Sequence, residues 1–364
     1  MIVKNKIIVF IIVIIVSILI GVVFNNIYID NLRRQGNLQE ALNSIAVLRN
    51  VDKQEQTKKF EPETILFVGD MMFDRGVEYL MNKNSFYYPF EKICDFLKKF
   101  DFVIGNLEGA IVENPPKFHR RSFSFAFSPD ILEPITFCNF NLFSLANNHS
   151  LNMGNNGFEE MKKILKNADI GFVGCPVKCD YEDVILEKND IIFLGFNKTF
   201  DYAFSDDEII EFVKQARKFH PEKFMIVMCH WGQEYKLKSS VAQQNLARKI
   251  IDNGCDLIIG HHPHVVQEIE IYNKKLIFYS LGNFIFDQYF SEAVEQSLGI
   301  GLEIYPDKIV YKLFPIQSNQ SQPFLMEQEQ ADKFLEKLSA RSSATLEQQI
   351  KNYLIEVEIK KENF

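Results

Sequence analysis

Short apolar segments alternate with helix-like segments along most of this 364-residue chain, and this alternation constrains the fold more than any other feature. From residue 64 onward, apolar segments of strand length occur at 65–69, 102–105, 142–146, 191–196, 224–229, 257–259, 276–281 and 299–304. The sequence predicts helices at 90–100, 206–219 and 241–253. Strands separated by helices indicate an α/β fold with a largely parallel sheet, and the strand-rich later part indicates a second, mixed sheet.

Polar blocks follow directly after these apolar strands. The blocks are Val68 to Asp70, Gly105 to Glu108, Ala146 to His149, Cys229 to Gly232 and Gly260 to His264. Five of the seven histidines fall in the last three blocks. Ligands of open α/β sheets bind at the carboxyl ends of the strands, so we expect these blocks to converge on one site.

The side chains in these blocks are those that divalent first-row metal ions bind. The candidate ligands are Asp70, Glu108, Asn148, His230, His262 and His264. Side chains alternate along an extended segment, so the His-x-His spacing directs two imidazoles to the same side. A pair of metal ions bridged by a carboxylate lowers the pKa of a bound water and aligns it with a phosphorus atom or another electrophile. His149 is then placed to protonate the leaving oxygen, which makes it a candidate catalytic residue.

Each block also has a structural interpretation. Asp70 could cap a helix, and the Asn147-Asn148 pair could form a turn. Arg75 is a second candidate catalytic residue, because it could clamp an anionic substrate, but a surface salt bridge explains it equally well. Trp231 could line the site or serve packing alone. Because the structural interpretation would have to hold independently for all five blocks, we favour the metal site.

The N-terminus contains an uncharged apolar run, residues 7–24, that just reaches the length of a membrane-spanning helix. Lys4 and Lys6 precede it, so we expect residues 1–24 to form a cytoplasmic N-terminus and a transmembrane signal anchor, with the rest of the chain exported. A cleaved signal peptide is the alternative, although no small-x-small site follows Phe24. This pattern predicts a single-pass protein of the cytoplasmic membrane whose polar residues 25–63 form a stalk.

Charge and cysteine usage exclude some classes of protein. A formal net charge of −8 argues against nucleic-acid partners, which need a basic surface. Six scattered cysteines are too few for a disulfide scaffold in a chain of this length. Cys175 and Cys179 are close enough to pair, but their spacing is a weak signal, and we interpret the others as small core residues.

Six ordered motifs carry a resemblance to a known family. They are Gly-Asp-Met-Met-Phe-Asp-Arg-Gly, Gly-Asn-Leu-Glu, Ser-Leu-Ala-Asn-Asn-His, His-Trp-Gly-Gln-Glu-Tyr, Gly-His-His-Pro-His-Val-Val-Gln and Tyr-Ser-Leu-Gly-Asn-Phe-Ile-Phe-Asp. Over about residues 64–316 this set resembles the CapA family of capsule biosynthesis proteins, within the calcineurin-like metallophosphoesterase superfamily. The resemblance implies a four-layer αββα sandwich, which we place at residues 64–323 before a helical C-terminal tail at 324–364.

The resemblance also implies a function and roles for individual residues. It implies biosynthesis or export of poly-γ-glutamate or a related anionic surface polymer, with a membrane-bound polymer synthase as a possible partner. Asp70 resembles the first metal ligand, Glu108 the bridging carboxylate, and Asn148 and His149 the pair of ligand and general acid. The later imidazole ligands correspond to His230, His262 and His264, with His261 ambiguous.

Two positions depart from the expected pattern. The wider superfamily has a histidine where this chain has Met72, which removes one metal ligand that Asp74 or Asp287 could replace. CapA-like chains usually have an aspartate where this chain has Asn152, and the change would weaken general-acid chemistry at His149.

Two functions therefore compete. The first is metal-dependent hydrolysis or transfer at a phosphoester or acyl-phosphate, with two divalent ions of Mn, Fe or Zn and an anionic polymer or phosphorylated substrate. The second is a non-catalytic, metal-stabilised subunit that binds the polymer or the synthase. The presence of His149 favours the enzyme, whereas Met72 and Asn152 favour the scaffold.

Overall fold

The computed structural model describes residues 15–29, 61–117 and 123–359. The chain divides into two units, Met1–Glu61 and Pro62–Phe364. The described residues of the first unit form one helix over residues 15–29. Most of the predicted stalk, residues 30–60, lies outside the described residues.

The prediction of an N-terminal transmembrane helix is wrong by the criterion of length and hydropathy. Among the described residues, no helix is both long enough and apolar enough to cross a membrane. Residues 7–14 of the predicted span lie outside the described residues. The single-pass membrane localisation inferred from that span is corrected by the same finding.

The second unit contains a sheet of nine strands within the described residues. Its strands are β1 (Thr64–Met71), β2 (Phe102–Leu107), β5 (Phe140–Ser144), β6 (Gly171–Val173), β13 (Asn283–Ile285), β14 (Gln296–Ile304), β15 (Lys308–Asn319), β16 (Gln322–Leu325) and β17 (Leu354–Glu358). The order is β16-β15-β14-β1-β2-β5-β6, with β13 paired to β1 and β17 to β15. Strands β1, β2, β5 and β6 are parallel, whereas β14 to β17 are antiparallel.

A second sheet has six strands in the described part of the chain. They are β7 (Ile185–Lys188), β8 (Ile191–Asn197), β9 (Phe224–His230), β10 (Leu257–His261), β11 (Ile269–Tyr272) and β12 (Lys275–Phe278). The order is β11-β12-β10-β9-β8-β7, with β8, β9, β10 and β12 parallel. A separate two-stranded ribbon pairs β3 (Ala110–Ile111) with β4 (Ala126–Phe127).

The two sheets pack face to face because their strands are apolar on both sides. In β1, Ile65 and Phe67 belong to the core between the sheets, whereas Leu66 and Val68 face the opposite side. Strand β9 has the same alternation: Ile226 points into the shared core and its neighbours point outward. This period of two places every second side chain on the same face.

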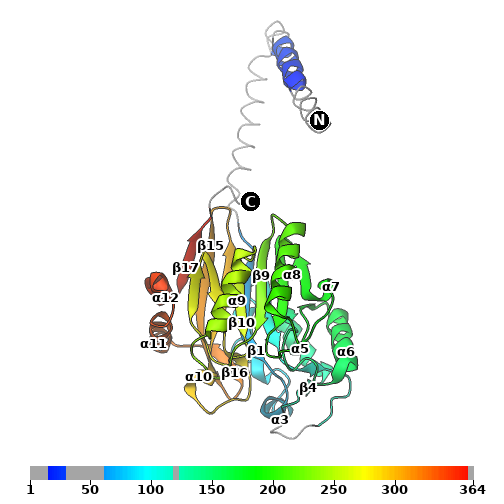
Figure 1. Ribbon diagram of the computed structural model, residues 1–364, viewed down its shortest axis with the longest axis vertical. Coiled ribbons are helices and arrows are strands. Elements are labelled where there is room, and N and C mark those ends of the chain that lie inside the picture. The colour runs from blue at the N-terminus through cyan, green and yellow to red at the C-terminus, as the bar shows by residue number, and fades with distance from the viewer. Residues whose placement is uncertain (1–14, 30–60, 118–122, 360–364) are drawn as a thin grey trace. The chain divides into compact units, whose positions relative to one another are not determined.

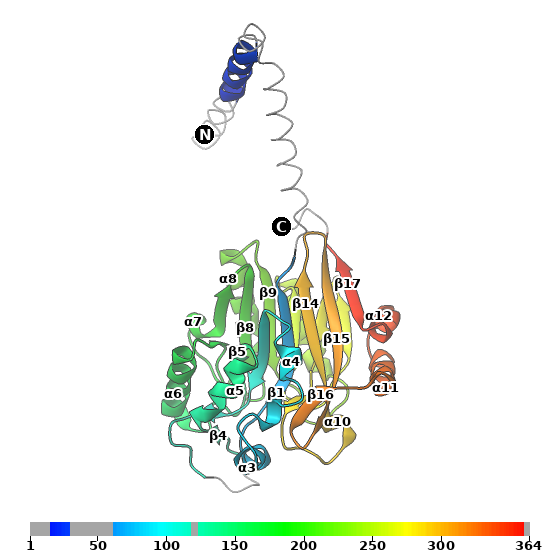
Figure 2. The same ribbon diagram turned by 180° about the vertical axis from the view of Figure 1, so that it is seen from behind.

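Helices cover both outer faces and complete four layers (Figures 1 and 2). The nine-stranded sheet is covered by α3 (Arg75–Lys83), α4 (Cys94–Leu97), α5 (Leu132–Phe137) and α6 (Gly154–Asn167). The six-stranded sheet is covered by α8 (Asp206–Phe219) and α9 (Val241–Asp252). Both α8 and α9 begin with a capping box, formed at Ser205 and Ser240, which satisfies backbone donors in the first turn.

The remaining elements are short or lie after residue 324. The short ones are η1 (Tyr88–Phe90), η2 (Pro129–Ile131), α7 (Tyr181–Val184), α10 (Glu292–Glu295) and η3 (Ala344–Leu346). The segment expected to be a helical tail contains α11 (Gln328–Ser339) and α12 (Glu347–Lys351). It then adds β17 to the sheet, and Phe334, Leu338 and Ile350 pack into the core between the sheets.

Two local predictions were wrong. The helix expected at 90–100 is limited to α4, which follows η1 and a turn at residues 91–93. Cys94 was expected to be an unpaired core residue, but it forms a disulfide with Cys138 across 44 residues of sequence. Cys175 and Cys179 are also paired, whereas Cys229 and Cys255 are free and buried, as expected.

Replacing both Cys94 and Cys138 with alanine should lower the free energy of unfolding by about 4 kcal/mol, because their disulfide closes a long loop of the unfolded chain. Replacing both Cys175 and Cys179 is the matched control, and their short loop predicts a loss of only about 2 kcal/mol. Urea unfolding followed by circular dichroism measures both. Equal losses for the two pairs would contradict this account.

Candidate metal centre

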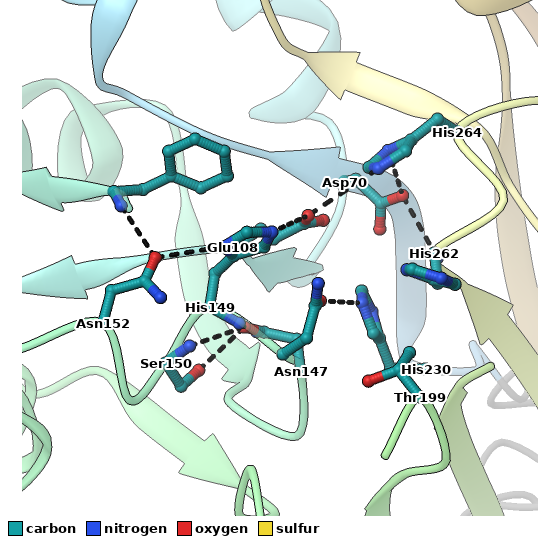
Figure 3. A network of polar contacts seen from close by, with 12 residues as sticks. Asp70, Glu108, Asn147, His149, Ser150, Asn152, Thr199, His230, His262 and His264 are labelled. Atoms are coloured by element: carbon teal, nitrogen blue, oxygen red, sulfur yellow. Dashed lines mark hydrogen bonds and ion pairs between the residues drawn. The ribbon is translucent and has the colours of Figure 1, made fainter. Parts of the chain in front are cut away.

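The predicted site residues lie at the carboxyl ends of strands from both sheets (Figure 3). Asp70 is at the end of β1, and Asn106 lies opposite it in register on β2. Glu108 follows β2, and His230 is the last residue of β9. Parallel strands that end at the same edge therefore place these side chains together.

Asn106 contacts the side chains of Asp70, Glu108 and His230. It is fully buried, and its Nδ2 donates to Asp70 Oδ1 at 2.8 Å. The same Nδ2 lies 3.4 Å from Glu108 Oε2 and 3.3 Å from His230 Nδ1. The backbone N–H of His262 adds a contact of 3.3 Å to Asp70 Oδ2. These donors partly compensate for the burial of two carboxylates.

One carboxylate oxygen of Glu108 has no hydrogen bond to compensate for its burial among the described residues. Its Oε1 is buried and has no hydrogen-bond partner among the residues that the structure describes. The nearest cationic candidates are His149 Nε2 at 3.6 Å and His264 Nε2 at 3.8 Å. Since buried acceptors are normally paired, this oxygen is a position where a cation would fit.

His264 points one ring nitrogen at the same oxygen. Its Nδ1 lies 2.9 Å from Asn283 Oδ1 and 3.3 Å from Asp70 Oδ2. Both partners accept hydrogen bonds, so Nδ1 carries a proton and Nε2 faces Glu108. The ligand atoms of Asp70, Glu108 and His264 all lie within 4.8 Å of one another. These three residues can hold one divalent metal ion, because the set combines two carboxylates with an imidazole.

A second group of candidate ligands lies beside the first. His230 Nε2 is 2.7 Å from Asn148 Oδ1, and the rings of His230 and His262 have centroids 4.8 Å apart. Two ligands on neighbouring positions of one ion lie about 3 Å apart when each is about 2.1 Å from the metal. His262 Nδ1 is buried and without a hydrogen-bond partner in the described part of the chain. His230, Asn148 and His262 therefore lie together beside the first cluster, and His230 belongs to no candidate metal cluster of the described residues.

His149 stands at the edge of these groups, with its ring between Asn152 and Glu108 (Figure 3). Asn152 Oδ1 accepts the backbone N–H of Phe125 at 2.7 Å, which identifies this atom as the amide oxygen. The same oxygen lies 3.0 Å from His149 Nδ1, so it can only accept there. The proton of neutral His149 is therefore on Nδ1, and Nε2 presents a lone pair to the site.

Arg75 lies beside the site, and its side chain already contacts other residues. Its guanidinium forms an ion pair with Asp287 and lies 4.7 Å from the ring centroid of Phe125. The Phe125 ring in turn packs on His149, with centroids 4.1 Å apart. This ion pair is largely buried, with side-chain exposures of 12% and 11%, so it is not the surface salt bridge that the sequence suggested, and the positive charge of Arg75 remains close to His149.

Other residues named from the sequence serve packing or local structure. His261 is buried and its Nε2 lies 3.3 Å from Val68 O. Trp231 is buried and donates its indole N–H to Tyr279 O at 2.9 Å, so it packs rather than lines the site. The sulfur of Met72 accepts the N–H of Asp74 at 3.0 Å.

Neither carboxylate suggested as a replacement for the ligand missing at Met72 reaches the metal cluster. Asp74 accepts the N–H of Arg75, the first residue of α3, and the N–H of Ala126 on β4. Asp287 accepts from Arg75 and from the N–H of Gly76. Among the described residues, the candidate metal clusters include neither aspartate.

Burial shifts the pKa values of the site in two directions. Burial raises the pKa of Glu108 to about 8. Burial alone would lower the pKa of His264, but the charge of Glu108 and the contact with Asp70 raise it to about 9. Burial would also raise the pKa of Asp70, but His264 and His261 hold it below its usual value.

His149, His230 and His262 are neutral at neutral pH because their pKa values are lowered. Burial lowers the pKa of His149 to about 4 and that of His262 to about 3. The pKa of His230 is also well below its usual range, first because of burial and then because of the neighbouring histidines. Neutral imidazoles are the form that binds metal ions.

Sequence reasoning missed three residues of this region. Asn106 and Asn283 orient the ligands, and Glu234 lies in a cluster with His262 and His264. Glu234 was part of the fourth motif but received no role. Asn106 could have been found from its place at a strand end beside Glu108.

The metal-free protein should be most stable near about pH 6.5 and lose stability as the pH rises from about 6.5 to about 9. The raised pKa values of Glu108 and His264 mean that the folded state binds more protons than the unfolded state in this range, so their stabilisation disappears as those protons leave. The lowered pKa values of the other histidines act oppositely below about pH 6.5.

Thermal unfolding across this pH range, with and without Mn²⁺, measures the effect. A metal ion replaces these protons, so the rise in Tm on adding Mn²⁺ should be larger at about pH 8 than at about pH 6. A rise in Tm that does not depend on pH would show that Glu108 and His264 do not exchange protons for metal.

The comparisons with known proteins agree with the motifs. The family model "Bacterial capsule synthesis protein PGA_cap" matches residues 64–288. The capsule biosynthesis protein CapA of Bacillus anthracis is 30% identical over 261 residues, which cover 65% of this chain and 63% of that protein. The PGA biosynthesis protein CapA of Bacillus subtilis is 31% identical over 250 residues, covering 64% and 65% respectively. The match therefore spans less than two thirds of either relative.

A solved structure of a purple acid phosphatase from yellow lupin seeds aligns over 73% of this chain and 54% of its own, with a TM-score of 0.37 and 11% identity. That similarity is too low to carry an argument about the site. The family model covers more than half of the 364 residues, from β1 to the residues that follow β13. The chain belongs to the bacterial capsule synthesis protein family.

Proposed function

We propose that this chain is a metal-dependent hydrolase or transferase that acts on a phosphoester or acyl-phosphate during assembly of an anionic surface polymer such as poly-γ-glutamate. The polymer assignment is supported by the names of its CapA relatives, which are a capsule biosynthesis and a PGA biosynthesis protein. The chemistry rests on one observation above others: the cluster of Asp70, Glu108 and His264, in which Glu108 Oε1 is buried without a partner among the described residues.

The donor set fits two divalent ions of the Mn, Fe or Zn class. Asp70, Glu108 and His264 would hold the first, and Glu108, Asn148, His230 and His262 the second. Two such ions supply Lewis acidity that lowers the pKa of a bound water and offsets the charge of a phosphoryl group. The protein's own part is to exclude water from the carboxylates, which are fully buried.

His149 would handle the proton at the edge of this site. Its Nε2 has no proton at neutral pH, because burial lowers the pKa and Asn152 holds the proton on Nδ1. A phosphate anion next to Nε2 favours the protonated ring. His149 then delivers a proton to the leaving oxygen only when an anionic substrate is present. Arg75, held by Asp287, adds positive charge beside the same position.

His149→Ala should reduce turnover of phosphoester substrates by about 10² to 10⁴, the range typical of a lost general acid, and should leave the metal content unchanged. Elemental analysis of the purified chain, together with monoester and diester hydrolysis assays in Mn²⁺, Fe²⁺ or Zn²⁺, measures both quantities. About two ions per chain with turnover is expected for the wild type. One ion or none, without turnover, would reject the enzymatic proposal.

A second candidate function is a non-catalytic subunit that binds the anionic polymer or a polymer synthase. The observation that favours it is the contact between His149 and Asn152, where an amide supplies orientation without negative charge. Asn152→Asp should raise the pKa of His149, because a carboxylate favours the protonated ring. NMR titration of the ring measures this. If Asn152 is the reason that the site lacks catalytic activity, Asn152→Asp should gain turnover. Unchanged turnover in Asn152→Asp would show that Asn152 is not the cause.

A further inference from the structure

The first metal position has fewer ligands from the chain than a closed site of this kind requires. Asp70, Glu108 and His264 form its donor cluster. The residue two positions after Asp70 is Met72, which is fully buried and whose sulfur accepts the N–H of Asp74. Ions of the Mn, Fe or Zn class take at least four ligands and favour oxygen and nitrogen over thioether sulfur.

A carboxylate on the solvent side can supply another ligand. Glu234 lies in the loop after β9, and its ligand atom is within 4.8 Å of those of His262 and His264. Glu234 is exposed, whereas His262 and His264 are 8% and 3% exposed. Because His264 also belongs to the cluster with Asp70 and Glu108, the two clusters share one imidazole.

His262 gives independent evidence that this second cluster receives a ligand. Its Nδ1 is buried and has no hydrogen-bond partner among the described residues. Its backbone is held at φ +94°, and that of His264 at φ +57°, in a region that side chains other than glycine rarely adopt. Strained backbone persists where the surroundings enforce it, and such positions cluster at functional sites.

The loop that carries Glu234 is fixed to the loop of the two histidines. The N–H of Tyr235 donates to Pro263 O at 2.8 Å, and its hydroxyl accepts from Gln288 Nε2 at 3.1 Å. Gly232 begins the turn with φ +91°, and a Cβ there would meet the side-chain amide of Gln243 at 2.6 Å. The position of Glu234 over His262 and His264 is therefore set by the backbone on both sides.

We propose that Glu234 is a metal ligand, which coordinates from the solvent side together with His262 and His264. This inference rests on the metal centre of the proposed function. The Glu234 carboxylate, which is exposed when no ion is bound, would then bind a divalent cation.

The test compares Glu234→Gln with Glu292→Gln in the full chain. Glu292 is an exposed glutamate whose carboxylate accepts a hydrogen bond from Gln296 Nε2 at 3.0 Å, and it belongs to no metal cluster of the described residues. Mn²⁺ binding by calorimetry should show one class of sites weakened by roughly tenfold or more in Glu234→Gln, at least the loss seen when the supporting partners of a ligand are removed. Glu292→Gln should bind Mn²⁺ as the wild type does.

The visible spectrum of the Co²⁺-loaded protein is a second readout, because it responds to the loss of a ligand and does not depend on turnover. Glu234→Gln should change the spectrum, and Glu234→Asp should restore part of the affinity. Wild-type affinity and an unchanged spectrum in Glu234→Gln would overturn the assignment of Glu234 while leaving the metal centre intact. Failure of the wild type to bind Mn²⁺ or Co²⁺ would overturn both.

Discussion

Two carboxylates without access to water lie at the ends of neighbouring parallel strands, and the organisation of the site depends on how their charge is balanced. Asp70 and Glu108 are both fully buried. Removing a carboxylate from water is unfavourable unless hydrogen bonds or a cation replace the solvent. Asp70 obtains donors from Asn106, His262 and His264, whereas Glu108 keeps one oxygen without a partner among the described residues. A proton or a divalent cation has to complete the balance.

The sandwich supplies the geometry that makes this burial possible. Asp70 faces Asn106 on one neighbouring strand and Asn283 on the other. Asn106 holds the carboxylates, and Asn283 holds His264 so that Nε2 turns to Glu108. The register of β1 with β2 and β13 therefore fixes both the acids and the imidazole that contacts them. The second sheet contributes His230 and the loop of His262 and His264 from its own strand ends.

Much of this arrangement could be predicted from the sequence, because apolar strands of fixed length end in polar blocks. The strands expected at 65–69, 102–105, 224–229 and 257–259 correspond to β1, β2, β9 and β10, and helices 206–219 and 241–253 to α8 and α9. The disulfide between Cys94 and Cys138 could not be predicted, because it depends on packing across 44 residues. The apolar N-terminal run suggested a transmembrane helix from hydropathy alone, and no helix in the described part of the chain meets the length and hydropathy of a membrane span.

The finer chemistry of the site also lay beyond the sequence. The sequence shows Asn152 but not its contacts: its Oδ1 accepts the N–H of Phe125 and holds the proton of neutral His149 on Nδ1. Glu234 was passed over because its approach to the histidines depends on backbone at positive φ in two loops, which no periodic pattern reveals. Arg75 was balanced between two interpretations, and only the structure shows its ion pair with Asp287.

The most direct test of a metal centre at Glu108 is anomalous diffraction from crystals of the protein grown with Mn²⁺. The account predicts one anomalous peak among Asp70, Glu108 and His264 and a second beside Asn148 and His230, with Glu108 between them. Crystals in which Mn²⁺ is bound elsewhere, and Glu108 contacts only protein groups, would contradict it.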